Sequence, residues 1–402
     1  MDLRPKARLL LACTLGIVAA VLSAAPAASA GPVYPAPDPD GFYAAPDNLA
    51  GVAPGDVLRA RPVANGRFPG SQVWQLLFRS TDSTGGPIAA VTTLISPGAG
   101  PRPLLSYQAF VNSLGLQCAP SHALFDGGLK EAGGLKEAGA LNLLLARGWA
   151  VSVPDHLGPD SAYGAARMGG QITLDGIRAV QRFAPAGLGN SPVGLAGYSG
   201  GAMSTGFAAA LAPEYAPELP IVGVAQGGLP VNPGQMAVQI GDHPHPLFGL
   251  GFAVAMGLER EYPDALQLDR ALTPAGRAMR DRLANSCTDD IISAGAGHSI
   301  GEFFTSGMES EFSTVSTFHA NALEEFPGIP RAPIYQWHGG NDQVPLQPAL
   351  DTAGRYCAAG TPVQFDVIPG VDHAGAMFPG TMNAVRYLAD RFAGLPAPSN
   401  CH

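Results

Sequence analysis

Two serines of the chain lie in the pattern Gly-x-Ser-x-Gly, which can present a serine hydroxyl as a nucleophile. Ser199 lies in Gly-Tyr-Ser-Gly-Gly at 197–201, and Ser299 lies in Gly-His-Ser-Ile-Gly at 297–301. A nucleophilic serine of this kind needs a buried strand before it and a helix after it, with small neighbours that allow a sharp turn. The residues around Ser199 have this character, whereas those around Ser299 do not. We therefore predict that Ser199 is a nucleophile and that Ser299 is a loop serine.

Asp342 and His373 supply the other two groups that such a serine needs. An imidazole takes the proton of the hydroxyl, and a carboxylate orients the imidazole and stabilises its charged form. Each of these residues lies on a loop just after an apolar, strand-like segment. The order Ser, Asp, His is that of the α/β-hydrolases. Asp372 is a rival acid, but adjacent residues on one loop cannot easily face each other.

The tetrahedral intermediate of this chemistry carries an oxyanion, which needs hydrogen-bond donors. We expect the backbone N–H of Gly200, directly after the nucleophile, to be one donor. The second should come from a loop after an early strand. The loop at 110–113 follows an apolar segment at 104–108 and is the candidate.

Short apolar or alternating segments, interspersed with helix-like runs, must position these residues. The predicted strands are 71–79, 88–95, 104–108, 149–153, 193–196, 221–224, 334–337 and 363–368. The predicted helices are 141–147, 171–183, 202–211 and 382–392. This alternation predicts an α/β-hydrolase fold, with a largely parallel central sheet flanked by helices. We expect an extended N-terminal arm at 31–70 and a core formed by 71–226 and 330–402.

The stretch 227–329, called the insertion below, interrupts the strand rhythm. It contains an uncharged apolar run at 247–258 that includes Leu247, Phe248 and Phe252. One interpretation is a helical cap whose apolar run acts as a lid over a substrate pocket and turns outward at a lipid surface. The other is a fixed helix packed in the core.

The first 30 residues have the features of a secretory signal peptide. Three basic residues precede an apolar run at 9–22 and the small residues Ala28-Ser29-Ala30, so we predict export and cleavage after Ala30. A lipoprotein signal ending at Cys13 is the alternative, but only three apolar residues would separate Arg8 from Ala12, far fewer than such a signal needs.

Four cysteines remain after this cleavage: Cys118, Cys287, Cys357 and Cys401. In an oxidising compartment an even number favours two disulfides, and the spacing alone leaves three pairings open. No Cys-x-x-Cys or His-x-x-x-His spacing suggests zinc, so we expect no metal.

The composition excludes some partners. Hydrophobic residues make up 46% and charged residues 14% of the 402 residues, and the net charge is −9 without any basic run. These values argue for a large core and against nucleic acid or anionic membrane surfaces as partners. No segment after the N-terminal one reaches the roughly 18 apolar residues of a membrane-spanning helix.

Several motifs resemble those of the secretory lipases typified by lipase A of Candida antarctica. They are Ser-Tyr-Gln-Ala-Phe-Val-Asn-Ser at 106–113, Cys-Ala-Pro-Ser at 118–121, Pro-Asp-His-Leu-Gly-Pro at 154–159, Ser-Ala-Tyr-Gly at 161–164, Leu-Asp-Gly-Ile-Arg-Ala at 174–179, and the loops of Ser199, Asp342 and His373. The family usually has an aspartate as its second oxyanion residue, and the matching position here is Asn112, which can donate through its backbone and its amide. The family usually has Glu at the position of Leu157.

The resemblance also implies the disulfides Cys118–Cys287 and Cys357–Cys401 and an insertion that shapes the acyl pocket. We predict an exported serine hydrolase that cleaves carboxylic esters through an acyl-enzyme, with triacylglycerol as the leading substrate. A carboxylesterase or acyltransferase acting on smaller soluble esters is one alternative, and a catalytically silent lipid-binding surface protein is another. We expect no cofactor, a lipid or ester as substrate, and transient binding at a lipid–water interface. The sequence does not predict the oligomeric state.

Overall fold

The computed structural model describes residue 1 and residues 31–64, 66–125, 132–233, 236, 243–305 and 316–401. The predicted signal peptide, its cleavage after Ala30 and part of the insertion therefore lie outside the described residues. Across the described part of the chain, no helix combines the length and the apolar character needed to cross a bilayer.

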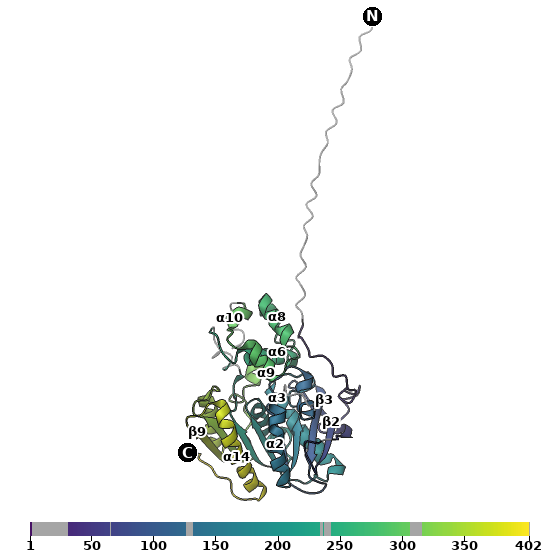
Figure 1. Ribbon diagram of the computed structural model, residues 1–402, viewed down its shortest axis with the longest axis vertical. Helices are drawn as coiled ribbons and strands as arrows, with labels where there is room; N and C mark the ends of the chain where they lie inside the picture. Colours follow the sequence, from purple (N-terminus) through teal and green to yellow (C-terminus); the bar gives the residue numbers. More distant parts are fainter. Residues whose placement is uncertain are drawn as a thin grey trace.

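A nine-stranded sheet forms the centre of the molecule (Figure 1). Its strands are β1 Val57–Pro62, β2 Gln72–Thr81, β3 Pro87–Ser96, β4 Leu104–Gln108, β5 Ala150–Pro154, β6 Val193–Tyr198, β7 Ile221–Gly227, β8 Ile334–Gly339 and β9 Val363–Ile368. They lie in the order β1-β2-β3-β5-β4-β6-β7-β8-β9. The pairs from β1 to β5 are antiparallel, and all pairs from β5 through β4 to β9 are parallel. The carboxyl ends of the parallel strands therefore meet at one edge of the sheet.

Strand β1 comes from the segment that the sequence analysis assigns to the N-terminal arm. It pairs antiparallel with β2 and forms the edge of the sheet. None of its residues is fully buried. An edge strand of this kind lacks the apolar alternation that marks the other strands, which is why the pattern does not predict it.

Helices cover both faces of the sheet. The core helices are α1 Pro120–Ala123, α2 Ala132–Ala146, α3 Ala166–Arg182, α4 Gly200–Tyr215, α13 Leu346–Ala358 and α14 His373–Phe392, with 3₁₀ turns at Leu116–Cys118 and Ala184–Ala186. Side chains of α3, α4 and α13 share one apolar cluster with alternate strand residues such as Leu104. Side chains of α2 and α14 share another cluster with their neighbours, such as Leu105. The two clusters lie on opposite faces because successive strand residues point to opposite sides.

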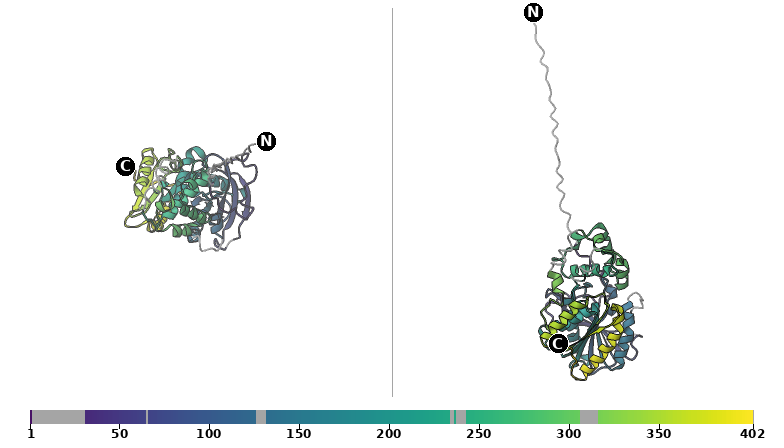
Figure 2. Two further views of the ribbon diagram at one scale, coloured as in Figure 1. Left: turned by 90° about the horizontal axis from the view of Figure 1, so that it is seen from above. Right: turned by 90° about the vertical axis from the view of Figure 1, so that its left-hand side faces the viewer.

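The insertion lies between β7 and β8 and is helical. Its described helices are α6 Phe248–Glu261, α7 Leu268–Ala271, α8 Pro274–Leu283, α9 Thr288–Gly295, α10 Ile300–Phe303 and α12 Ser316–Ala320. Figure 1 shows α6, α8, α9 and α10 together at one end of the molecule, and the right-hand view in Figure 2 shows the same separation from the sheet. Their apolar side chains, which include Phe248, Phe252, Phe303 and Phe304, share one cluster with core residues such as Phe78 of β2 and Ile172 of α3.

Several contacts join the insertion to the core, among them a disulfide and the buried Arg260. The disulfide Cys118–Cys287 links the residue before α9 to the loop after β4. A second disulfide, Cys357–Cys401, lies within the core and links α13 to the C-terminal tail. Both pairs are those that the resemblance to the secretory lipases implies. Arg260, near the end of α6, donates to five carbonyl oxygens at 2.8–3.0 Å, those of Val33, Leu114, Asp160, Ser161 and Ala284. Burial lowers the pKa of Arg260 to about 10. These contacts hold one end of α6 against the core.

Candidate active site

Ser199 lies on a sharp turn between β6 and α4. Its φ is 54°, and Ser161 is the other non-glycine residue with a positive φ in the described part of the chain. Such a backbone is strained for a residue with a Cβ and is typical of a nucleophile elbow. A Cβ on Gly201 would lie 2.1 Å from the carbonyl oxygen of Gln108, and one on Gly197 would lie 2.4 Å from Thr205 Oγ1. Positions 197 and 201 therefore require glycine, because atoms of Gln108 and Thr205 occupy the space that a side chain would need.

Ser299, in the second Gly-x-Ser-x-Gly motif, caps the N-terminus of a helix. It precedes α10 and forms a capping box with Glu302, whose side chain accepts a hydrogen bond from the Ser299 backbone N–H at 2.9 Å. This is the reciprocal capping that stabilises helix N-termini. The two motifs therefore differ in what surrounds them, as the sequence analysis argues.

The structure brings Ser199, His373 and Asp342 together. His373 Nε2 lies 2.8 Å from Ser199 Oγ, and His373 Nδ1 lies 2.8 Å from Asp342 Oδ1. Asp342 follows β8, and His373 is the first residue of α14 after β9. The three residues lie beyond the carboxyl ends of neighbouring parallel strands, where such sheets place their sites.

Asp342 is held in its ionised form by its partners. Its side chain is fully buried, and burial disfavours the charge; the hydrogen bond and charge of His373 outweigh this and lower the pKa of the carboxyl. The backbone N–H of Val344 also donates to Asp342 Oδ1 at 2.8 Å. An ionised acid is what a histidine needs in order to be oriented and stabilised as a cation.

Asp372, the rival acid, has a different role. Its side chain accepts a hydrogen bond from the backbone N–H of Gly375 at 2.8 Å and so caps the N-terminus of α14. The capping fixes the first turn of the helix, whose first residue is His373.

Tyr198 also positions His373, which the motif does not reveal. Its hydroxyl donates to the backbone carbonyl of His373, and its ring centroid lies 5.1 Å from that of the imidazole. The Tyr198 ring also stacks on that of Trp337, with the two ring centroids 5.8 Å apart. The residue before Ser199 in the Gly-x-Ser motif thus holds His373, whose imidazole contacts the serine hydroxyl.

The two predicted oxyanion residues lie side by side. Gly200 is the first residue of α4, so its N–H has no acceptor within the helix. A Cβ on Gly200 would lie 1.9 Å from Asn112 Oδ1, which places the Asn112 amide directly against this turn. The backbone N–H of Asn112 donates instead to Thr288 Oγ1 at 3.1 Å. The backbone N–H of Asn112 is thus already engaged, and the side-chain atom that faces Gly200 is the acceptor oxygen, so an oxyanion donor from Asn112 has to be its side-chain NH2 group.

A cavity of 190 Å³ opens beside Ser199 and His373. Most of its other walls are apolar, and they include Phe110, Tyr163, Met203, Leu247, Leu250, Val254, Ile292 and Val344. Four of these residues belong to the insertion. Apolar walls around a few polar groups are typical of ligand sites.

Helix α6 presents only part of its predicted apolar surface to this cavity. Leu247, Leu250 and Val254 share one helix face and line the cavity, whereas Phe248 and Phe252 are each 2% exposed. The Phe248 ring stacks on Phe303 at 5.2 Å, and Phe252 lies 5.3 Å from Phe304. Phe248 and Phe252 are therefore core residues of the insertion in this structure.

The glycines of α6 allow close packing. A Cβ on Gly249 would lie 2.1 Å from the carbonyl oxygen of Ile291 in α9, and one on Gly257 would lie 2.1 Å from that of Tyr163. Of the two interpretations of this apolar run, a mobile lid and a fixed helix, these contacts favour a fixed α6.

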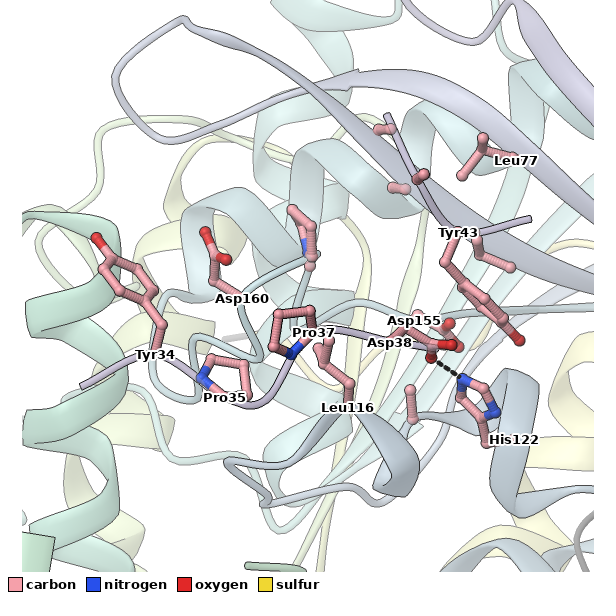
Figure 3. A pocket seen from close by; sticks show the side chains of 17 residues that line it. Tyr34, Pro35, Pro37, Asp38, Tyr43, Leu77, Leu116, His122, Asp155 and Asp160 are labelled. Atoms are coloured by element: carbon pink, nitrogen blue, oxygen red, sulfur yellow. Dashed lines mark ion pairs between the residues drawn. The ribbon is translucent and has the colours of Figure 1, made fainter. Parts of the chain in front are cut away.

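A second cavity, of 400 Å³, lies under the N-terminal arm (Figure 3). Asp38 of the arm pairs with His122 at 2.7 Å, and Tyr43 stacks on the same imidazole at 4.6 Å. Ser121 Oγ donates to Asp155 at 2.6 Å, and burial raises the pKa of Asp155 to about 6. Ser121 is thus bound to a carboxylate, and the cluster fastens the arm to the core.

Comparison with known proteins gives a consistent result. The family described as "Secretory lipase" matches residues 136–400. A secreted triacylglycerol lipase of Malassezia furfur is 31% identical over 392 residues, covering 91% of this chain and 82% of that protein. A protein of Mycobacterium tuberculosis named a probable inactive lipase is 33% identical over 390 residues, covering 91% and 84%. Candida antarctica lipase A in its closed state matches with a TM-score of 0.83 at 26% identity and 90% coverage of both chains. This match confirms the predicted α/β-hydrolase fold.

Proposed function

The chain belongs to the secretory lipase family, and on that premise we propose that Ser199, His373 and Asp342 carry out its ester hydrolysis. The protein is a secreted lipase, and a lipase cleaves carboxylic esters. The observation that carries the assignment is the continuous hydrogen-bond path from Ser199 Oγ through the imidazole to Asp342, with both distances at 2.8 Å.

In the first half-reaction Ser199 Oγ attacks the ester carbonyl carbon while His373 Nε2 takes the hydroxyl proton. The tetrahedral intermediate then collapses, the C–O bond to the alcohol breaks, and His373 returns the proton to the leaving alkoxide. The product is an acyl ester of Ser199 and a free alcohol. Asp342 stays ionised and holds the imidazolium throughout.

In the second half-reaction a water molecule attacks the acyl-enzyme with His373 as the base. The fatty acid leaves, and the proton returns to Ser199. The backbone N–H of Gly200 and the side-chain amide of Asn112 stabilise the oxyanion of both intermediates, and each such donor contributes about 10²–10³-fold in rate.

We further infer that triacylglycerol is the substrate and that the insertion caps the acyl pocket. The support is the apolar wall that Leu247, Leu250, Val254 and Ile292 add next to Ser199. The fatty acyl chain of a lipid would bury its apolar surface there. Export through a signal peptide cleaved after Ala30 is part of the same proposal.

Labelling with a fluorophosphonate probe tests the nucleophile. The wild type should be labelled on the peptide that contains Ser199, and Ser199→Ala should abolish labelling. Ser299→Ala is the matched control, because it removes the serine of the other Gly-x-Ser-x-Gly motif and should be labelled like the wild type. Unlabelled wild type, or equal labelling of Ser199→Ala, would refute the proposal.

A catalytically silent lipid-binding protein is the second candidate, because one relative is named a probable inactive lipase. It predicts no labelling and no acid release from tributyrin, with lipid binding retained.

A carboxylesterase or an acyltransferase is distinguished from a lipase by its substrates. A lipase should act on emulsified long-chain triacylglycerol, whereas an esterase should act on dissolved short esters alone. An acyltransferase should transfer the acyl group to an added alcohol.

A further inference from the structure

The outward face of the first half of α14 is apolar. The helix buries Ala376, Gly380 and Ala384 against the sheet, and this spacing of four residues defines its inner face. Phe378 lies on the opposite side of the helix and is 74% exposed. Met377 and Met382 are 43% and 44% exposed. A surface helix normally has polar or charged side chains at such positions.

The distribution of charge along α14 is uneven. No Asp, Glu, Lys or Arg occurs from His373 to Val385, and the first charged residue of the helix is Arg386. The apolar half is therefore the half that begins at the catalytic histidine. The right-hand view of Figure 2 shows α14, in yellow, on the outside of the sheet.

This surface adjoins the rim of the active-site cavity. His373 lines the cavity together with Gln343 and Val344, and its side chain is 21% exposed. The helix runs directly from this rim, so Met377 and Phe378 lie one turn of helix or slightly more from the reacting group.

We propose that Met377, Phe378 and Met382 form a docking surface that seats the enzyme on an uncharged lipid surface, such as a triacylglycerol droplet. The proposal rests on the function proposed above and adds the place where the enzyme meets its aggregated substrate. Side chains at a lipid surface bind by removing their apolar area from water, and binding here brings the rim with His373 to that surface.

Area and charge favour a lipid over a second copy of the chain or an anionic bilayer. One aromatic side chain buries about 150–250 Å², so three side chains offer well under the roughly 800 Å² per partner of a stable protein interface. The chain has a net charge of −9, and the local charges Asp372 and Arg386 at the two ends of the patch offset each other, so an anionic surface would repel the protein as a whole.

Adsorption to droplets tests the proposal without hydrolysis. In the Ser199→Ala background, the double variant Phe378→Ser/Met382→Ser is mixed with a triolein-in-water emulsion, and the fraction that floats with the droplets is measured against lipid concentration. Half-maximal adsorption should require at least about tenfold more lipid, because an exposed Phe and Met no longer enter the lipid. Met377→Ser is a second, independent variant and should shift adsorption in the same direction.

Leu143→Ser is the matched control. Leu143 is 63% exposed on α2, which packs in the same layer as α14, but it lies near the helix end that leads into the start of β5, at the opposite edge of the sheet. It should adsorb like the parent protein. With Ser199 restored, the patch variants should hydrolyse triolein emulsion about tenfold more slowly and dissolved p-nitrophenyl butyrate at the wild-type rate.

Unchanged adsorption of the patch variants, or an equal loss in Leu143→Ser, would overturn the proposal. A fall in hydrolysis of the dissolved ester would do the same, as would a change in molar mass by light scattering, which would make the patch a contact between copies. A protein that adsorbs through Phe378 yet is not labelled at Ser199 would refute the proposed function and leave the docking surface standing.

Discussion

At Asp342 two effects on the carboxyl oppose each other. Burial disfavours its charge, and the hydrogen bond and charge of His373 favour it more strongly, so the pKa of Asp342 falls. In the proposed mechanism the ionised Asp342 holds Nδ1 of His373, and Nε2 is left facing Ser199.

Asp342→Asn should lower kcat by on the order of 10³–10⁴-fold with little effect on the fold. The amide can still accept the hydrogen bond from Val344, but it no longer stabilises the imidazolium and favours the wrong tautomer of His373. Steady-state hydrolysis of a dissolved p-nitrophenyl ester measures the effect. Asp372→Asn is the control: Asn caps a helix as well as Asp does, so its activity should stay near that of the wild type. A larger loss in Asp372→Asn than in Asp342→Asn would reverse the assignment of the acid.

The proximity of Ser199, Asp342 and His373 could be predicted because each follows a strand of the parallel sheet in a fixed order. The surroundings could not be predicted, because they depend on contacts between distant segments. Thr288 removes the Asn112 backbone N–H from the set of oxyanion donors although the two residues are 176 positions apart. The Tyr198 hydroxyl reaches the His373 carbonyl across 175 positions.

Among the helices, α6 lines the cavity beside Ser199, and its C-terminal end is fixed to the core. Arg260 satisfies five carbonyl groups that come from the arm, two core loops and the segment before α9. The planar guanidinium can reach all five, whereas an ammonium group has three donors at one point. The helix is thereby anchored at the end away from Leu247.

Arg260→Met should destabilise the protein by about 3 kcal/mol or more, because several buried carbonyl groups lose their donor and each unsatisfied group costs about 1–3 kcal/mol. Arg260→Lys should fall between this variant and the wild type. Urea unfolding followed by fluorescence gives the free energies. Arg282→Met, an exposed position on α8, should change stability by no more than about 0.5 kcal/mol. A loss of the same size in Arg282→Met would mean that Arg260 has no special role.

The sequence predicts eight of the nine strands because each contains a short apolar or alternating segment, and in most of them these residues are buried beneath helices. It does not predict β1, none of whose residues is buried, or α13, whose exposed residues Gln347, Asp351 and Gly354 interrupt the apolar pattern. It also cannot say which side of α6 faces the pocket. The run at 247–258 is apolar all round, since one side lines the cavity and the other packs inside the insertion.

For the molecule as a whole, buried carboxyl groups set the dependence of stability on pH. Burial raises the pKa of Glu261, at the end of α6, to about 7, although Ser83 donates a hydrogen bond to it at 2.7 Å. The folded protein then keeps a proton that the unfolded chain releases above a pKa of about 4.3. Stability contributed by this group is therefore present at low pH and is lost as the pH rises towards 7. Asp155 acts in the same direction.

Glu261→Gln should be more stable than the wild type at pH 8 and about equal to it at pH 4.5. The glutamine can still accept the bond from Ser83, and it no longer needs to lose a proton. Urea unfolding at the two pH values measures the difference. Glu214→Gln on α4 removes one exposed carboxylate and controls for net charge. Equal stability of Glu261→Gln and the wild type at both pH values would contradict the raised pKa.

The glycine contacts of α6 also bear on how this protein can diverge. Positions 249 and 257 admit no side chain, because carbonyl oxygens of Ile291 and Tyr163 occupy the space, and Phe248 and Phe252 are committed to the interior of the insertion. Substitutions that change acyl preference are therefore expected mainly at Leu247, Leu250 and Val254, which line the cavity beside Ser199. Homologues that differ in acyl preference should therefore differ in sequence at these three positions, whereas the other residues of the helix should change little.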